Sequence, residues 1–167
     1  AHDDKRVAVA LANCIAAGTS LRLQDILCTS HPKAEARLKP GEDINDTLSD
    51  HLKACRILIP IISEKSVRRN YVLFEIGGAW VLDKKKVMPV LVERRMKAKM
   101  PEVIRGLVYT EYDSREGMKA LLMAINQVIF VAGRPKDKKE AEAEVEAAVD
   151  EYLKKLRPTK KIRKAGK

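Results

Sequence analysis

The sequence predicts an α/β fold, a layered arrangement with a central parallel sheet and helices on both of its faces. Two nearly continuous apolar runs, RILIPII at Arg56–Ile62 and KVMPVL at Lys86–Leu91, are typical of strands buried on both sides. Segments with helical spacing of apolar residues alternate with these runs through short polar loops. This alternation favours parallel strands joined by crossover helices, which form a three-layer sandwich.

The first part of the chain predicts helix, strand, loop and helix. Apolar residues recur at helical spacing across Asp3–Ala17, and Gly18 is placed to end that helix. A short strand is predicted at Ile26–Thr29, followed by a polar loop in which His31 is expected to be solvated. Glu42–Ala54 predicts the second helix, because acids in its first turns complement the positive helix end.

The second part of the chain continues the alternation. Pro60 removes a ladder donor, so it is placed near the end of the first apolar strand. Asn70 is placed to cap a largely buried helix at Tyr71–Leu82. A short edge strand is predicted at Leu107–Tyr109, and the last helix of the body at Arg115–Val131.

The chain divides into a body and an extension. The body covers residues 1–132, and a polar hinge follows at Gly133–Lys139. Glu140–Leu156 predicts an amphipathic helix whose apolar stripe packs on the body, on a second copy or on another domain. The hinge and helix suggest a connection to a sensor, so deletion from Glu140 onward is expected to impair activation while the body stays folded. Residues 157–167 form a basic tail that is expected to be disordered.

Charge and composition restrict the class of partner. The formal net charge is +10, and the tail supplies six basic residues and no acid, so the body is only mildly basic. A solvated tail is therefore favoured over a nucleic-acid-binding arm. Neither the three cysteines nor the three histidines show metal-ligand or disulfide spacing. No apolar run is long enough to cross a bilayer and no secretory pattern is present, which favours a cytoplasmic protein.

Sequence motifs restrict the kinds of reaction and the ligand site that this chain can have. The chain has no P-loop, no G-x-G-x-x-G and no G-x-S-x-G. In parallel α/β sheets ligands bind beyond the carboxyl ends of the strands, which points to the loops Thr29–Gly41 and Ser63–Asn70. Glu75 follows the second loop and is the only acid in the apolar helix YVLFEIGGAWVL. A carboxylate there is either structurally paired or functional, and the residues alone leave both open.

Three passages of the sequence resemble a TIR (Toll/interleukin-1 receptor) domain of the bacterial kind. They are DILCTSHP, LKPGEDINDTLSDHLKACRILIPIIS and NYVLFEIGGAWVLDKKKVMPVLV, and the resemblance covers about Ala1 to Val131. LFEIGGAW followed by KKVMPVLV is its most specific part. The resemblance implies a flavodoxin-like fold with a parallel sheet. Many bacterial members of the family hydrolyse NAD⁺ in anti-phage defence, and others act as assembly modules.

The resemblance also implies roles for individual residues. Glu75 takes the position of the family's catalytic glutamate, in a site often written W-x-x-x-E that has Tyr71 in place of the tryptophan. Thr29 and Ser30 begin the loop that borders the family's nucleotide pocket, and Ser63 sits where the third strand opens toward that pocket. The expected substrate contacts are therefore Thr29, Ser30, Ser63 and Tyr71. NAD⁺ would be the substrate, with no cofactor and no metal.

Cleavage of NAD⁺ suits a single carboxylate. Nicotinamide departs as a neutral group and needs no general acid, so the second carboxylate of a glycosidase can be absent. A fixed carboxylate can stabilise the oxocarbenium that develops on the ribose. Attack by water gives ADP-ribose, and attack by adenine gives a cyclic isomer. The alternative function is a non-catalytic scaffold that signals through TIR–TIR contacts.

The expected sheet lacks its first strand. A flavodoxin-like sheet has the order 2-1-3-4-5, so this strand would lie between Ile26–Thr29 and Arg56–Ile62. Without it, buried edges would leave unpaired backbone groups that cost about 1–3 kcal/mol each. We therefore expect an apolar strand upstream of Ala1, or another segment in its slot, and no direct pairing of Ile26–Thr29 with Arg56–Ile62.

Overall fold

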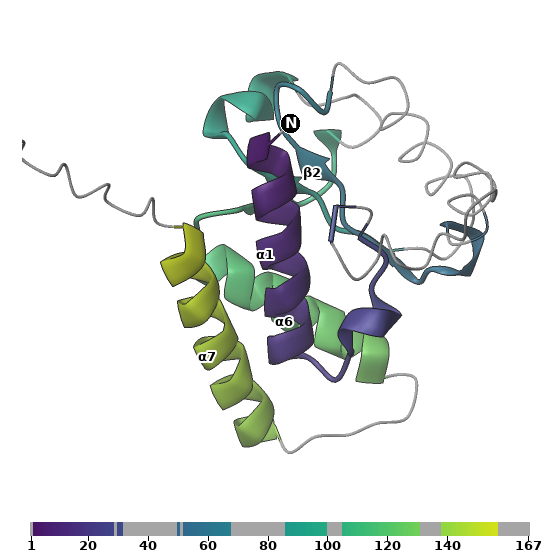
Figure 1. Ribbon diagram of the computed structural model, residues 1–167, viewed down its shortest axis with the longest axis vertical. Helices are drawn as coiled ribbons and strands as arrows, with labels where there is room; N and C mark the ends of the chain where they lie inside the picture. Colours follow the sequence, from purple (N-terminus) through teal and green to yellow (C-terminus); the bar gives the residue numbers. More distant parts are fainter. Residues whose placement is uncertain are drawn as a thin grey trace, which may run out of the picture.

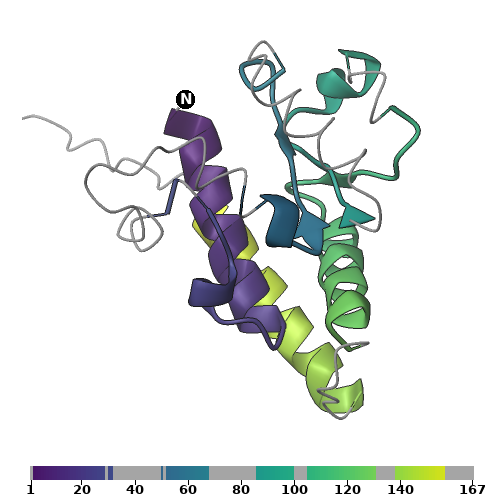
Figure 2. The same ribbon diagram turned by 90° about the vertical axis from the view of Figure 1, so that its right-hand side faces the viewer.

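The chain forms a small parallel sheet with long helices packed beside it (Figure 1). The computed structural model describes residues 2–28, 30–31, 50, 52–67, 86–99, 105–130 and 138–156. Within these ranges the long helices are α1 (His2–Gly18), α6 (Arg115–Phe130) and α7 (Lys138–Leu156). The view turned by 90° shows α1 and α7 running alongside each other, as the first view does (Figure 2). The predicted α/β fold with a parallel sheet is confirmed.

Within the described ranges, the sheet is built from three stretches of chain that run parallel. The first holds β1 (Ile57–Leu58) and β2 (Ile61–Ile62), and the second holds β3 (Lys86–Val87) and β4 (Val90–Leu91). β1 pairs with β3, and β4 lies between β2 and β5 (Thr110–Glu111). Both ladders between the first two stretches share one register, since Ile57 pairs with Lys86 and Ile61 with Val90. The two predicted apolar strands are therefore present and adjacent.

Prolines divide each of these two strands into halves. Pro60 has no N–H to donate, but its carbonyl still accepts the Val90 N–H at 2.9 Å. Pro89 likewise accepts the Thr110 N–H at 2.8 Å. This stretch ends at Ile62, just beyond Pro60, so the predicted place of Pro60 near the strand's end is confirmed. One missing donor interrupts the ladder without ending it.

Both faces of the sheet are buried, as the apolar runs predict. Alternate strand residues pack with the helices on one face, among them Ile57, Ile59, Ile61, Met88 and Val90. Ile62, Val87 and Leu91 belong to a second cluster, with Met96 and Tyr109. Because side chains alternate along a strand, these two clusters occupy opposite faces.

The structure differs from the prediction at two short strands. Within Ile26–Thr29, the described residues 26–28 join no ladder. Just before them the chain turns through the 3-10 helix η1 (Leu23–Asp25), which Asp25 closes by accepting the Arg22 N–H at 2.9 Å. The edge strand expected at Leu107–Tyr109 is instead β5 at Thr110–Glu111. Its position follows from its hydrogen bonds to the neighbouring strand, which begin at Thr110.

The helices pack around one apolar cluster. α1 contributes Leu11 and Ile15, α6 contributes Leu122, and α7 contributes Val149 and Tyr152, all of them buried. The predicted helices at Asp3–Ala17, Arg115–Val131 and Glu140–Leu156 are confirmed over the residues that the structure describes. Of the three surfaces expected to receive the stripe of the last helix, the structure shows packing on the body.

Gly18 ends α1, as predicted, and it also permits close packing of the helices. It is the last residue of α1 and does not adopt the left-handed conformation of a helix-ending glycine. A Cβ at this position would lie 2.8 Å from Leu122 Cδ1 and 3.1 Å from Ala148 Cβ. The Asn126 side chain also donates to the Gly18 carbonyl at 3.1 Å. Gly18 therefore allows α1 to approach α6 and α7 closely.

The remaining predicted helices fall largely outside the described residues. Of Glu42–Ala54, residues 50 and 52–54 are described and are helical. The helix expected at Tyr71–Leu82 lies outside the described ranges. A search of the described helices for one long and apolar enough to span a bilayer finds no candidate.

Candidate functional site

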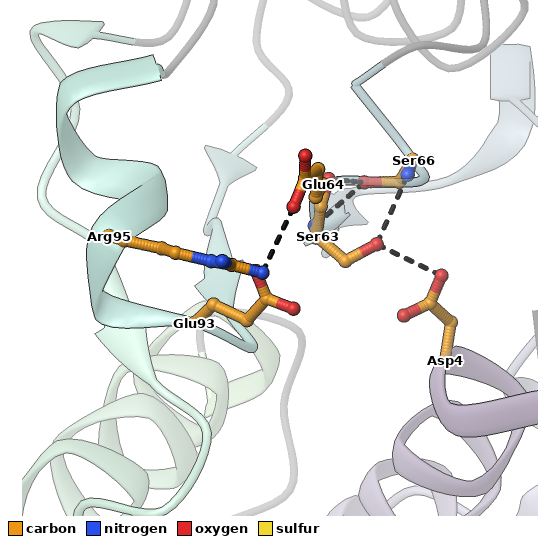
Figure 3. A network of polar contacts seen from close by, with 6 residues as sticks. All are labelled: Asp4, Ser63, Glu64, Ser66, Glu93 and Arg95. Carbon is orange, nitrogen blue, oxygen red and sulfur yellow. Dashed lines mark hydrogen bonds and ion pairs between the residues drawn. The ribbon is translucent and has the colours of Figure 1, made fainter.

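The carboxyl ends of the strands gather at one edge of the sheet, where ligands bind in parallel α/β folds. Ser63 follows β2 directly, and Glu93 lies two residues beyond β4. The first turn of α1 reaches the same edge, where Asp4 faces Ser63 (Figure 3). Residues from three distant parts of the chain therefore meet at this edge.

The turn from Ser63 to Val67 is tied together by its own hydrogen bonds. The Ser63 N–H donates to Ser66 Oγ at 2.8 Å, and the Ser66 N–H donates to Ser63 Oγ at 3.1 Å. The Ser63 carbonyl accepts from Ser66 Oγ at 3.1 Å and from the Val67 N–H at 3.2 Å. Both serines are buried, with exposed fractions of 3% and 8%. Because both serines are buried and hydrogen-bonded to each other, the turn has one well-defined geometry.

Asp4 joins α1 to this turn. Ser63 Oγ donates to Asp4 Oδ2 at 2.9 Å, across 59 residues of sequence. The carboxylate sits near the positive end of α1, where a negative charge interacts favourably with the helix dipole. Asp4 is partly buried, so this charge-assisted bond is screened less than one on the open surface.

On its other side the turn meets the 3-10 helix η2 (Arg94–Lys99). Arg95 contacts Glu64 at 2.9 Å and Glu93 at 2.9 Å, and Arg94 contacts Glu111 at 2.8 Å. The hydrogen bond to Glu93 is the main cause of the raised pKa of Arg95, and the nearby carboxylate charges add to it. The arginine side chains are exposed, so these ion pairs are screened by solvent.

The loop expected on the opposite side of the pocket is described only in part. Ser30 is partly buried and lies within the turn that the His31 N–H closes by donating to the Cys28 carbonyl at 2.9 Å. Burial raises the pKa of the Cys28 thiol, and the backbone N–H groups of Ser30 and His31 partly oppose that shift. His31 is buried rather than solvated, because the turn folds it inward.

The structure brings together only some of the predicted site. Ser63 meets Asp4 and Ser66, whereas no hydrogen bond among the described residues joins Ser63 to Ser30. Glu75, Tyr71 and Thr29 lie outside the described residues.

Sequence reasoning missed Asp4. Two acids at the start of a helix are an ordinary N-terminal pattern. Nothing in the neighbouring sequence indicates that Asp4 contacts Ser63, which follows β2. The described residues hold no group of three or more His, Cys, Asp or Glu that could bind a metal, and among them Cys14, Cys28 and Cys55 form no disulfide.

The architecture defines an α/β protein whose polar network lies where this class binds ligands. A family model described as TIR domain matches residues 1–122, which is most of the chain. The chain therefore belongs to the TIR domain family, as the sequence passages indicate. The matched range includes Asp4, Ser63 and Glu75, and it ends before α7. No curated protein and no solved structure matches this chain.

Proposed function

We propose that this chain cleaves the nicotinamide–ribose bond of NAD⁺, with Glu75 as the catalytic carboxylate. Membership of the TIR family supports the proposal, since the family includes NAD⁺ hydrolases. The observation that carries it is the buried, hydrogen-bonded turn at the carboxyl edge of the sheet. From this turn the chain enters the segment that holds Glu75, so the candidate carboxylate follows a well-defined anchor at the edge where ligands bind.

The proposed reaction needs stabilisation of positive charge more than proton transfer. The bond from the ribose to nicotinamide breaks, and its electron pair neutralises the pyridinium as nicotinamide departs. The ribose carbon becomes oxocarbenium-like, and the Glu75 carboxylate stabilises it electrostatically. Water then attacks to give ADP-ribose and a proton, or the substrate's adenine attacks to give a cyclic isomer.

The substrate contacts in this proposal are Thr29, Ser30, Ser63 and Tyr71. The hydrogen bonds of Ser63 restrict what it can contribute. Its hydroxyl proton goes to Asp4, and one acceptor position is taken by the Ser66 N–H. A serine hydroxyl has two acceptor positions, so Ser63 can accept one further bond, such as one from a ribose hydroxyl.

We extend the proposal to context. In this proposal the domain is flavodoxin-like, and the enzyme works in the cytoplasm in bacterial anti-phage immunity. Self-association is general among TIR domains. The proposed activity requires it, so the rate of nicotinamide release per chain should rise with protein concentration. A sensor, either a further domain or a partner protein, would control that assembly.

Release of nicotinamide from NAD⁺ tests the proposal directly. Wild-type chain at high concentration should release it, and Glu75→Ala should be slower by roughly 10²–10³-fold, the usual cost of removing one electrostatic stabiliser. Glu142→Ala, which removes an exposed acid on α7 outside the matched range, is the matched control and should retain full turnover. Equal turnover of Glu75→Ala and wild type would overturn the assignment. Assembly without any nicotinamide release would favour the scaffold role.

A further inference from the structure

The contact between Asp4 and Ser63 links two segments that nothing local brings together. Ser63 Oγ donates to Asp4 Oδ2 at 2.9 Å, and the same oxygen accepts the Ser66 N–H at 3.1 Å. The Ser63 hydroxyl is therefore the junction between α1 and the hydrogen bonds inside the turn (Figure 3). If the Asp4 acceptor is removed, the hydroxyl of Ser63, a residue that is only 3% exposed, loses the partner that orients it.

The turn is held from two sides that differ in environment. Asp4 holds it through the buried Ser63, whereas Arg95 holds Glu64 from η2 with a side chain that is 67% exposed. An exposed ion pair restrains its partners weakly, because solvent screens it and long side chains resist ordering. The Asp4 contact is charge-assisted and better shielded, so it restrains the turn more strongly.

We propose that Asp4 is a positioning residue for the reaction. It acts through Ser63, orienting the Ser63–Val67 turn from which the Glu75 segment starts, and does not itself contact the substrate. This inference rests on the proposed function for its kinetic consequence, but its structural consequence can be measured without any turnover. It goes beyond the family assignment, because it comes from the observed contact across the sheet edge.

Three variants separate this role from general destabilisation. Asp4→Ala removes the acceptor, and Asp4→Asn keeps an amide oxygen that can accept from Ser63 without the charge. Arg6→Ala is the matched control on the same helix, because Arg6 donates to the carbonyls of Lys155 and Leu156 on α7. Arg6→Ala removes contacts of α1 to α7, whereas Asp4→Ala removes the contact of α1 to the Ser63–Val67 turn.

Hydrogen exchange of the turn is the first measurement. In the full chain, Asp4→Ala should speed exchange of the Ser66 and Val67 amides by on the order of tenfold, the local effect of losing one charge-assisted hydrogen bond. Asp4→Asn should exchange within about threefold of wild type, and Arg6→Ala should match wild type in this turn. Unchanged exchange in Asp4→Ala would overturn the proposal, whether or not the chain is active.

Steady-state kinetics supply the second measurement. Asp4→Ala should lower kcat by roughly tenfold to a hundredfold with little change in KM, because misplacement of a catalytic group slows the chemical step. In a Ser63→Ala background the same substitution should have almost no further effect on kcat, since both act through one contact. Additive effects of the two substitutions would overturn the inference. If wild type releases no nicotinamide, the proposed function fails. Hydrogen exchange then tests by itself whether Asp4 orients the turn.

Discussion

Different forces stabilise two regions of the molecule. One region is the helical layer formed by α1, α6 and α7, and the other is the carboxyl edge of the sheet. In the helical layer, side chains such as Leu122, Val149 and Tyr152 are almost fully buried against one another. At the carboxyl edge, a few hydrogen bonds join Asp4, Ser63 and Ser66, and the nearby ion pairs are exposed. Apolar burial is non-directional and large in sum, whereas each polar contact at the edge fixes one direction with a modest net free energy.

This difference separates what stabilises the chain from what orients the proposed site. Loss of packing between the helices should lower the free energy of unfolding of the whole chain. Loss of one polar contact at the edge should change local geometry with a small effect on global stability. The experiments below test that separation, from the largest expected effect to the smallest.

Removing α7 should abolish cooperative folding. Truncation after residue 137 exposes the surfaces that Val145, Val149 and Tyr152 cover, and each such side chain contributes about 1.5–3 kcal/mol. Single domains are stable by only about 5–15 kcal/mol. The sequence alone suggested that the body would survive this deletion, whereas the packing predicts that it does not. Circular dichroism during thermal unfolding measures the effect.

Truncation after Leu156 is the control for that experiment. It removes only residues 157–167 and leaves α7 in place, so the unfolding transition should match that of the full chain. A chain lacking α7 that unfolds with a normal midpoint would contradict the account of the helical layer.

Leu122→Ala should lower the free energy of unfolding by about 2–5 kcal/mol, because it leaves a cavity where α6 meets Gly18. Met123→Ala, the next residue on the same helix, is the control, since Met123 is 43% exposed and should lose far less. Urea denaturation gives both values. Equal losses would mean that burial does not distinguish these positions.

The helical layer should also lose stability at alkaline pH through Cys14. Burial raises the pKa of the Cys14 thiol from 9.0 to about 12, and the thiol faces the Ala148 carbonyl of α7 at 3.5 Å. Above pH 9 the unfolded chain releases a proton that the folded chain keeps, so stability falls as pH rises. The expected slope from this group is up to about 1.4 kcal/mol per pH unit.

Urea denaturation between pH 8 and 10 measures this slope. Cys14→Ala should flatten it, because that variant lacks the buried thiol. An identical slope in wild type and Cys14→Ala would exclude Cys14 as the cause.

Glu64→Gln should have the smallest effect. It removes an ion pair with an exposed arginine, and such pairs contribute about 0–1 kcal/mol. Thermal unfolding should therefore move little, and added salt should reduce even that difference. A loss as large as that of Leu122→Ala would mean that the carboxyl edge, not only the helical layer, stabilises the fold.

Several features of the fold were predictable because they depend on near neighbours in the chain. Apolar periodicity placed all three long helices within a few residues of their observed ends. The two apolar runs identified buried strands, since both faces of the sheet are covered. Short segments failed, as at Ile26–Thr29, because few residues carry a weak pattern and pairing depends on which strand lies beside them.

The sequence by itself determined the TIR family, the helices and the buried strands, because periodicity and motif spacing are local properties. It also singled out Glu75 and Ser63 as candidates, and the role of Glu75 stays a prediction. Only the tertiary structure decided that α7 packs on the body, that Gly18 permits close helix packing, and that Asp4 receives the Ser63 hydroxyl. These features join residues far apart in the chain, and their partners are selected by packing in space, which no local pattern encodes.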